Sequence, residues 1–322
     1  MTGSVFLTGA TGFVGSAIAQ RLLFDGSGSL TCSVRSDSAI LPTSARAVIC
    51  RDFSVNDGWQ DSLAGIDVVI HSAARVHVMN DSESDPLAAF RKVNVDGTLN
   101  LARQAVAAGV RRFIFISSIK VNGEGTEPGH PYRADDVPAP GDPYGVSKME
   151  AEQGLRELAA QTGLEVVIIR PVLVYGPGVK ANFMAMMRWL DKGVPLPFGA
   201  IDNRRSLVAL DNLVDLVGTC VTHPAAANQT FLVSDGEDLS TTALLCRMAQ
   251  ALGKSARLLP VPAWMLRAGA SLLGKGALSQ RLCGSLQVDI SKTRELLAWQ
   301  PPVSVDVAMR AAAKHFQETN KK

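Results

Sequence analysis

Short apolar and β-branched runs alternate with longer segments of helical length through the first half of the chain. The runs that predict strands are residues 4–8, 30–34, 47–50, 67–72, 112–117 and 165–169. The clearest helical segment between them covers residues 86–108 and ends before Gly109. This alternation predicts right-handed βαβ units and a parallel sheet with helices on both faces. Ligands of such sheets bind beyond the carboxyl ends of the strands.

The rhythm of strands and helices breaks after Pro171, where Gly, Pro and Asn become frequent. We expect helices over residues 211–222 and 241–252, and one more sheet strand over residues 228–233. An apolar stretch at residues 260–273 contains Trp264, Met265 and Leu266. We interpret it as a helix packed into the protein rather than one lying on a membrane surface.

These patterns predict two parts in the chain. The sheet should comprise residues 1–170, with a return segment at about residues 206–233. Residues 171–205 and 234–322 carry few strand signals and should form a smaller, mostly helical lobe over the strand ends.

A glycine motif, Gly9-x-x-Gly12-x-x-Gly15, lies between the first strand and the first helix. Gly9 permits a tight turn, Gly12 lets the backbone approach a pyrophosphate, and Gly15 lets the helix pack close to the strand. The helix N-terminus then offers free N–H groups to the phosphates. We therefore predict dinucleotide binding on an α/β fold, a Rossmann doubly wound parallel sheet with a smaller helical substrate lobe.

A second motif, Tyr144-x-x-x-Lys148, lies on a predicted helix that begins at Pro143 and stops at Gly163. Residues four apart share a helix face, so Lys148 can lie beside the Tyr144 phenol. A free tyrosine titrates near ~10. We expect the neighbouring ammonium to lower that pKa and make Tyr144 a proton donor and acceptor.

Composition narrows the functional classes. The 322 residues include 32 Lys and Arg against 30 Asp and Glu. The chain therefore lacks the excess of positive charge that would indicate a nucleic-acid partner. We expect no membrane insertion, because no apolar run is long enough to span a bilayer. Five scattered cysteines and five histidines show no metal-ligand spacing, so we predict no metal site. With the N-terminus already committed to a strand, we expect no signal peptide and a cytoplasmic location.

These motifs, with Ser117-Ser118 at a strand end and Arg170-Pro171, resemble an extended short-chain dehydrogenase/reductase over nearly the whole chain. The chain is most similar to the enzymes of that group that modify the hexose of a nucleotide-diphospho-sugar. The resemblance implies that Tyr144 is the acid/base, that Lys148 tunes it and binds the nicotinamide ribose, and that Ser118 orients the reacting oxygen. It also implies that Asn94 fixes the backbone of the active site.

The resemblance further implies a set of contacts to the cofactor. They come from the glycine loop and from the ends of later strands: Gly9, Thr11, Gly12, Phe13, Val14, Gly15, Asp52, Phe53, Ala73, Ala74, Asn94, Ser117, Tyr144, Lys148 and Pro171. At the end of the second strand an NAD site usually has an acidic residue, whereas this chain has Arg35. A guanidinium suits a phosphate dianion, so we favour NADP(H), with NAD(H) as the alternative.

On the substrate side, Asn182 and Arg205 resemble residues of the family that contact the nucleotide diphosphate. Arg281 is a second candidate clamp, and Lys120 is a candidate for selecting the sugar. Surface solvation is the alternative for both arginines, and it explains Arg281 nearly as well.

Several reactions run on this scaffold. The acidic pair that sugar dehydratases carry after the catalytic hydroxyl is replaced here by Ile119 and Lys120, which argues against dehydration. Arg35, and Asn122 where epimerases have Tyr, favour a reductase of a UDP-4-keto-6-deoxy-N-acetylhexosamine. The first alternative is a UDP-hexose 4-epimerase with tightly bound NAD. A non-catalytic NADP sensor is the alternative of another class, and retention of Tyr144 and Lys148 counts against it. The helices at residues 86–108 and 144–160 resemble a family dimer interface, which predicts a homodimer.

Overall fold

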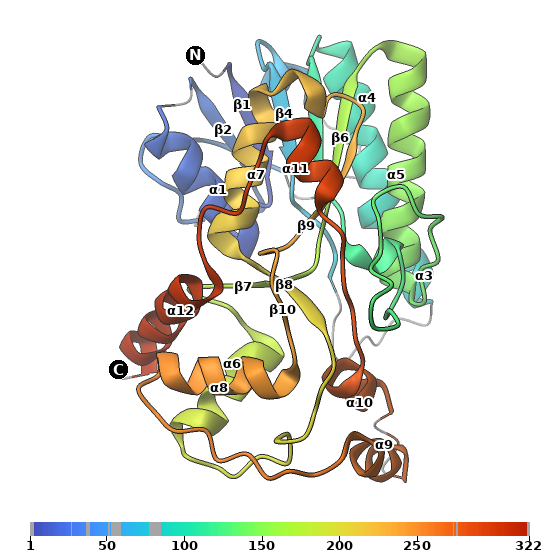
Figure 1. The fold of residues 1–322 in the computed structure, drawn as a ribbon. Coiled ribbons are helices and arrows are strands. Elements are labelled where there is room, and N and C mark those ends of the chain that lie inside the picture. Colours follow the sequence, from blue (N-terminus) through green and yellow to red (C-terminus); the bar gives the residue numbers. More distant parts are fainter. Residues whose placement is uncertain are drawn as a thin grey trace.

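A seven-stranded, wholly parallel sheet forms the larger part of the molecule (Figure 1). The structure, a computed structural model, describes residues 3–26, 28–36, 39–50, 52, 59–76, 85–272, 274 and 276–320. In spatial order the strands are β3 (Arg46–Ile49), β2 (Leu30–Val34), β1 (Val5–Thr8), β4 (Val68–His71), β5 (Arg112–Ile116), β6 (Glu165–Pro171) and β9 (Thr230–Val233). The predicted doubly wound fold is confirmed.

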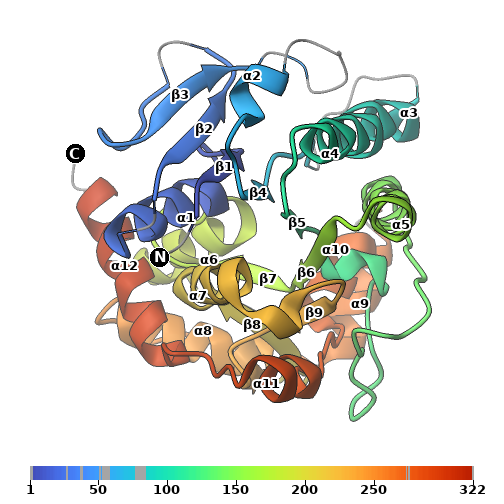
Figure 2. The same ribbon diagram turned by 90° about the horizontal axis from the view of Figure 1, so that it is seen from above.

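Helices cover both faces of this sheet, as Figure 2 shows from above. α1 (Phe13–Phe24) and α7 (Leu210–Thr222) share one apolar core with one face of the strands. α2 (Trp59–Leu63), α4 (Gly97–Ala107) and α5 (Pro143–Thr162) form a second core on the other face. Because both faces are covered, central strands such as β1 and β5 are buried at every residue, which explains their continuous apolar sequences.

The segment predicted as one helix over residues 86–108 has a local distortion. It comprises α3 (Pro86–Arg91), a π-helical turn η1 (Lys92–Asp96) and α4 (Gly97–Ala107). The Asp85 carboxylate begins the segment by accepting from the backbone N–H of Ala88 at 3.0 Å. Single π turns inside α-helices are frequent at functional sites, and this one carries Asn94.

A smaller lobe lies beyond the carboxyl ends of the strands (Figure 1). It contains a three-stranded sheet that the sequence did not predict, with β8 (Arg205–Ala209) between β7 (Leu173–Tyr175) and β10 (Asp238–Leu239). Three helices, α6 (Ala181–Asp191), α8 (Thr241–Ala251) and α12 (Val305–Asn320), share an apolar core with β7 and β8. The short elements η2 (Ile119–Val121), η3 (Pro224–Ala226), α9 (Ala263–Leu272), α10 (Gly276–Cys283) and α11 (Ser291–Leu297) complete the described chain.

The apolar stretch at residues 260–273 forms the expected helix, α9, but its predicted burial is wrong. No residue of α9 is buried, and Trp264 is 69% exposed. The helix lies at the edge of the lobe, where only Ala263, Leu266 and Ala270 on its inner side are half-buried. None of the helices that the structure describes is long and apolar enough to cross a membrane.

Candidate active site

The glycine loop between β1 and α1 is shaped for close approach of a ligand. Gly9 has φ +72°, a left-handed conformation that favours glycine. A Cβ atom on Gly15 would lie 2.1 Å from the carbonyl oxygen of Gly9, so α1 can pack this close only with glycine there. Gly12 occupies the N-cap of α1 and makes no side-chain cap. The first N–H groups of α1 therefore remain available for a pyrophosphate, and the loop fits a dinucleotide.

Beside these glycines, Thr11 is exposed, whereas Phe13 and Val14 are half-buried. The predicted alanines after β4 pack against the loop: the backbone N–H of Ala73 donates to Thr8 Oγ1 at 3.2 Å, and Ala73 and Ala74 are both half-buried. The predicted cofactor residues that follow β1, begin α1 and follow β4 thus lie together around the glycine loop.

Asn94 links this turn to α5. Its Oδ1 accepts from the backbone N–H of Arg75 at 2.8 Å, and its Nδ2 donates to the carbonyl of Arg75 and to Ser147 Oγ, each at 3.0 Å. The side chain is 1% exposed. Asn94 therefore holds the chain after β4 at a fixed distance from the helix that carries Tyr144.

The remaining predicted cofactor residues are more scattered. Arg35 follows β2 directly and is exposed. Asp52 lies 3.7 Å from Lys92 Nζ in an ion pair, and Phe53 lies outside the described residues. Pro171 ends β6 and is buried.

Helix α5 begins and ends as the sequence predicts. Asp142 caps it by accepting from the backbone N–H of Gly145 at 2.7 Å, and Pro143 occupies the first turn. Gly163 terminates it with φ +76°. Tyr144 therefore lies in the first turn of α5, with Lys148 one turn later.

Tyr144 departs from the expectation for its acidity. Its ring packs edge-on against Phe90 with 5.9 Å between ring centres. Burial, aided by the Asp142 carboxylate, raises the pKa of Tyr144 to about 12. The expected lowering by Lys148 is absent, and the pKa of Tyr144 is shifted by burial and by Asp142 instead.

Lys148 lies 2% exposed against the end of β5. Its Nζ donates to the carbonyl of Ile116 at 2.9 Å and lies 4.4 Å from the centre of the Phe115 ring. Burial lowers the pKa of Lys148 to about 7, and the Glu152 carboxylate opposes this shift. The lysine can therefore change charge near neutral pH.

Ser118 follows β5 and is half-buried. Its hydroxyl accepts from the backbone N–H of Lys120 at 3.3 Å and so caps the short turn η2. Lys120 pairs with Asp142 and with Glu124, the latter at 3.0 Å. Ile119 is buried. Neither Ile119 nor Lys120 carries an acidic group that could help to eliminate water.

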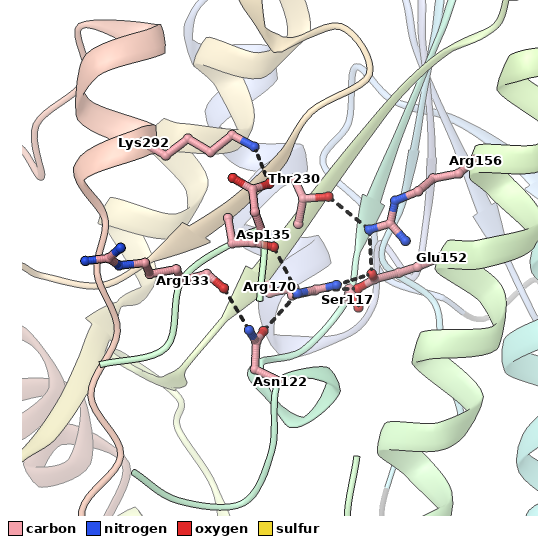
Figure 3. Close-up of polar contacts among 10 residues, drawn as sticks. Ser117, Asn122, Arg133, Asp135, Glu152, Arg156, Arg170, Thr230 and Lys292 are labelled. Atoms are coloured by element: carbon pink, nitrogen blue, oxygen red, sulfur yellow. Dashed lines mark hydrogen bonds and ion pairs between the residues drawn. The ribbon is translucent and has the colours of Figure 1, made fainter. Parts of the chain in front are cut away.

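A buried polar network lies behind these residues (Figure 3). Glu152 accepts from Ser117 Oγ at 2.6 Å and forms a two-pronged ion pair with Arg170 at 2.9 and 2.6 Å. Arg170 also donates to Asn122 Oδ1 at 2.9 Å, and Arg156 donates to the second oxygen of Glu152 at 2.9 Å. The Ser117 hydroxyl is thus directed into the protein and bonded to Glu152.

Sequence reasoning missed Glu152. The available signal was its spacing, because Glu152 follows Lys148 by four residues and Tyr144 by eight, on one face of α5. Nothing in the local pattern identified Asn122 as a partner of Arg170.

The predicted diphosphate contacts lie on the smaller lobe. Asn182 is exposed in the first turn of α6. Arg205 begins β8 and donates from Nη1 to the carbonyl of Gly284 at 3.1 Å, directly after α10. Arg281 belongs to α10, but its side chain lies outside what the structure describes. Arg205 and α10 are thus brought together, while Asn182 enters from a different helix.

Comparisons with known proteins fit this geometry. The model of the NAD dependent epimerase/dehydratase family matches residues 5–234. A Vibrio cholerae "UDP-glucose 4-epimerase" is 49% identical over 99% of this chain and 97% of its own. An Escherichia coli O157:H7 "N-acetyl-alpha-D-glucosaminyl-diphospho-ditrans,octacis-undecaprenol 4-epimerase" is 29% identical over 83% of this chain and 78% of its own.

Among solved structures, the "UDP-Glucuronic acid 4-epimerase" of Bacillus cereus in complex with NAD has the same fold, with a TM-score of 0.78. It is 22% identical and covers 98% of this chain and 99% of its own. The resemblance to the extended short-chain dehydrogenases/reductases is confirmed: the chain belongs to the NAD dependent epimerase/dehydratase family.

Proposed function

We propose that this protein is an NAD-dependent 4-epimerase of a UDP-hexose, UDP-glucose or UDP-N-acetylglucosamine. The observation that carries the proposal is the 49% identity to the Vibrio cholerae 4-epimerase across nearly the full length of both chains. The placement of the candidate residues agrees with it: Lys148 donates to the carbonyl of Ile116 at the end of β5, Ser118 follows that strand, and Tyr144 precedes Lys148 by one turn on α5.

The chain's own groups would move the proton. Tyr144 Oη would take the proton of the sugar 4-hydroxyl and later return it, while the Ser118 hydroxyl would hydrogen-bond the same oxygen. The nicotinamide, when bound, accepts the C4 hydride and gives it back. Because the pKa of Tyr144 is raised to about 12, it needs a nearby positive charge to act as a base. Protonated Lys148, on the same face of α5, would supply that charge.

On the substrate side, the UDP diphosphate would be held on the smaller lobe. Arg205 at the start of β8 and Arg281 on α10 are its proposed partners, with Asn182 in the first turn of α6. Lys120 stands beside Ser118, where it would face the sugar once released from Asp142 or Glu124.

For the cofactor, we propose NAD, because an epimerase returns the hydride within each cycle and needs no reducing equivalents. The NAD in the Bacillus cereus structure supports this choice. Arg35, exposed after β2, is the observation that favours NADP(H) instead, and its substitution decides between the two.

Reduction of a UDP-4-keto-6-deoxy-N-acetylhexosamine is the second candidate, supported by Arg35. The other argument for it weakens with the structure. Asn122, which stands where epimerases have Tyr, is 2% exposed and bonds Arg170 and the carbonyl of Arg133. An asparagine at this position is therefore explained by its hydrogen bonds in the buried network, and it does not discriminate between the two reactions.

A second class of substrate for the 4-epimerisation is a polyprenyl-diphospho-sugar. The Escherichia coli relative, named for such a substrate, supports it at lower identity. Both classes share a hexose on a diphosphate, so the same arginines would serve.

We also propose a homodimer through α4 and α5, which lie side by side on one face of the sheet (Figure 2). They pack closely, since a Cβ atom on Gly154 would lie 2.7 Å from Leu99. Light scattering coupled to size exclusion tests the dimer.

All five cysteines are free thiols, which supports the expected cytoplasmic location.

One experiment separates the reactions. The purified protein is incubated with UDP-glucose, UDP-N-acetylglucosamine or the UDP-4-keto-6-deoxy sugar, with and without NADPH, and the products are identified by NMR. A 4-epimer that forms without net consumption of NADPH supports the proposal. Loss of NADPH absorbance with the ketone alone would replace it with the reductase.

A further inference from the structure

Helix α9 turns apolar side chains toward solvent. Trp264 is 69% and Leu272 is 88% exposed, with Met265 and Ala268 exposed between them. Positions 264, 268 and 272 are spaced by four residues and form one stripe along the helix. Leu259, just before the helix, is also exposed and extends the apolar surface.

This surface is fixed to the lobe rather than frayed from it. The backbone N–H of Leu259 donates to the carbonyl of Leu196 at 2.8 Å, and Gly199 donates to the carbonyl of Leu259 at 2.9 Å. Pro262, immediately before α9, forms a bridge with Ala200. Arg267 donates to the carbonyl of Cys283 at 3.4 Å, which joins α9 to the end of α10. The exposed apolar stripe is therefore a standing feature of the fold.

The segment of the chain that carries the stripe has charged residues of one sign. Residues 239–288 contain no Asp or Glu and six cations: Arg247, Lys254, Arg257, Arg267, Lys275 and Arg281. Two of these are paired with acids from elsewhere, Arg247 with Glu237 and Lys254 with Asp191. Arg257, just before Leu259, and Arg267, within α9, are both exposed. The whole chain is nearly neutral, so this local excess is specific to the segment.

We propose that α9, with Leu259 and Arg257, is a docking surface for an anionic lipid membrane. An exposed helix that combines Trp, Met and Leu with Arg is typical of helices that lie in the interface plane of a bilayer. The arginines would meet lipid phosphates while Trp264 and Leu272 enter the acyl boundary. Such docking requires no helix that crosses the membrane.

A second copy of the chain is a poorer occupant of this surface. In a two-fold symmetric dimer the same patch faces itself, so Arg257 and Arg267 would lie opposite their own copies with no acidic residue from residues 239–288 to offset them. Like charges brought together across an interface oppose association. An anionic bilayer satisfies both the charge and the apolar area.

The surface lies at the end of the lobe farthest from the seven-stranded sheet (Figure 1). α10, beside α9, ends next to Arg205, the proposed diphosphate contact. Docking would therefore place the substrate side of the enzyme at the membrane. The proposal does not depend on which sugar is turned over.

The test is sedimentation of the full-length protein with vesicles of phosphatidylglycerol and phosphatidylethanolamine, and with vesicles of phosphatidylcholine alone. We expect binding to the anionic vesicles that weakens with salt. The double variant Trp264→Ser/Leu272→Ser should have an affinity for these vesicles that is lower by at least about tenfold, since both positions lose their apolar transfer energy. The matched control Phe24→Ser/Ile40→Ser, which removes two equally exposed apolar residues from the sheet domain, should bind like the wild type.

Two outcomes overturn the proposal. One is vesicle binding that the Trp264→Ser/Leu272→Ser variant leaves unchanged. The other is no binding of the wild type to the anionic vesicles; an oligomer that the variant disperses would then assign α9 to contacts between copies. Circular dichroism and turnover of UDP-sugar without vesicles check that the variant folds. Failure of the proposed 4-epimerase would appear as absent turnover in the wild type and would leave the vesicle result intact.

Discussion

Glu152 and Arg170 form an ion pair with both side chains almost wholly buried, 0% and 2% exposed respectively, directly behind the candidate catalytic residues. Glu152 lies one turn after Lys148 on α5, and Arg170 lies at the end of β6. The same carboxylate raises the pKa of Lys148 against the effect of burial. The pair therefore connects the stability of the carboxyl end of β6 to the charge of Lys148.

Removing the carboxylate should be costly. Glu152→Gln leaves the Arg170 guanidinium buried without its counter-charge, and we expect a loss of about 3–5 kcal/mol in the free energy of unfolding. The control is Glu150→Gln on the same helix, whose partner Arg91 is half exposed, with an expected cost below about 1 kcal/mol. Urea denaturation measures both.

A double variant completes this test. Glu152→Gln/Arg170→Met removes both charges, so it should recover part of the lost stability. If Glu152→Gln costs no more stability than Glu150→Gln, the buried pair does not stabilise the contact between α5 and the carboxyl end of β6.

The stability of the protein should rise with pH because of Lys148. The pKa of this lysine falls from 10.5 to about 7 on folding, so between these values the unfolded chain binds more protons than the folded one. Raising the pH through that window therefore stabilises the fold, by up to about 1.4 kcal/mol per pH unit. Below about pH 7 the lysine is charged in both states and the contribution is flat.

Lys148→Met isolates this contribution. The difference in unfolding free energy between wild type and variant should shift in favour of the wild type from about pH 7 to about pH 9. Lys254→Met, which removes an exposed lysine, is the control and should leave the slope unchanged. Parallel curves for wild type and Lys148→Met would show that the lysine keeps its ordinary pKa.

The features that the sequence predicted well depend on local chemistry. The limits of α5 follow from a cap at Asp142, Pro143 at the start and Gly163 at the end, all readable within one stretch. The glycine loop is equally local, since Gly9 and Gly15 are needed by the turn itself.

The features that were missed depend on packing between distant segments. Arg170 reaches Asn122 across 48 residues of sequence, and no pattern predicts that contact. The pKa of Tyr144 is set by burial against Phe90, so spacing to Lys148 alone gave the wrong direction. The apolar composition of α9 suggested burial, but whether another element covers a helix is decided only by the fold.

Arg35 decides the cofactor. If its guanidinium holds a ribose 2′-phosphate, Arg35→Asp should lower the affinity for NADPH about tenfold or more and leave NAD binding intact or improved. Arg46→Asp on the neighbouring strand β3 makes the same charge change at another exposed position and should leave NADPH binding nearly unchanged. Calorimetric titration of the wild type and both variants with both dinucleotides measures the six affinities. Equal NADPH affinities in wild type and Arg35→Asp would leave NAD as the only supported cofactor.

Tyr144→Phe removes the proposed proton carrier while keeping the ring that packs against Phe90. Because general acid–base catalysis contributes about 10²–10⁴ in rate, kcat for the sugar should fall by that factor. NAD affinity and the unfolding midpoint should change little, since the Tyr144 hydroxyl makes no hydrogen bond among the residues that the structure describes. Tyr132→Phe is the control: its hydroxyl donates to the carbonyl of Gly125 at 2.6 Å, so its loss should cost stability but little turnover. Turnover of Tyr144→Phe close to that of Tyr132→Phe would remove Tyr144 from the mechanism and return the search for the acid/base to the groups around Ser118.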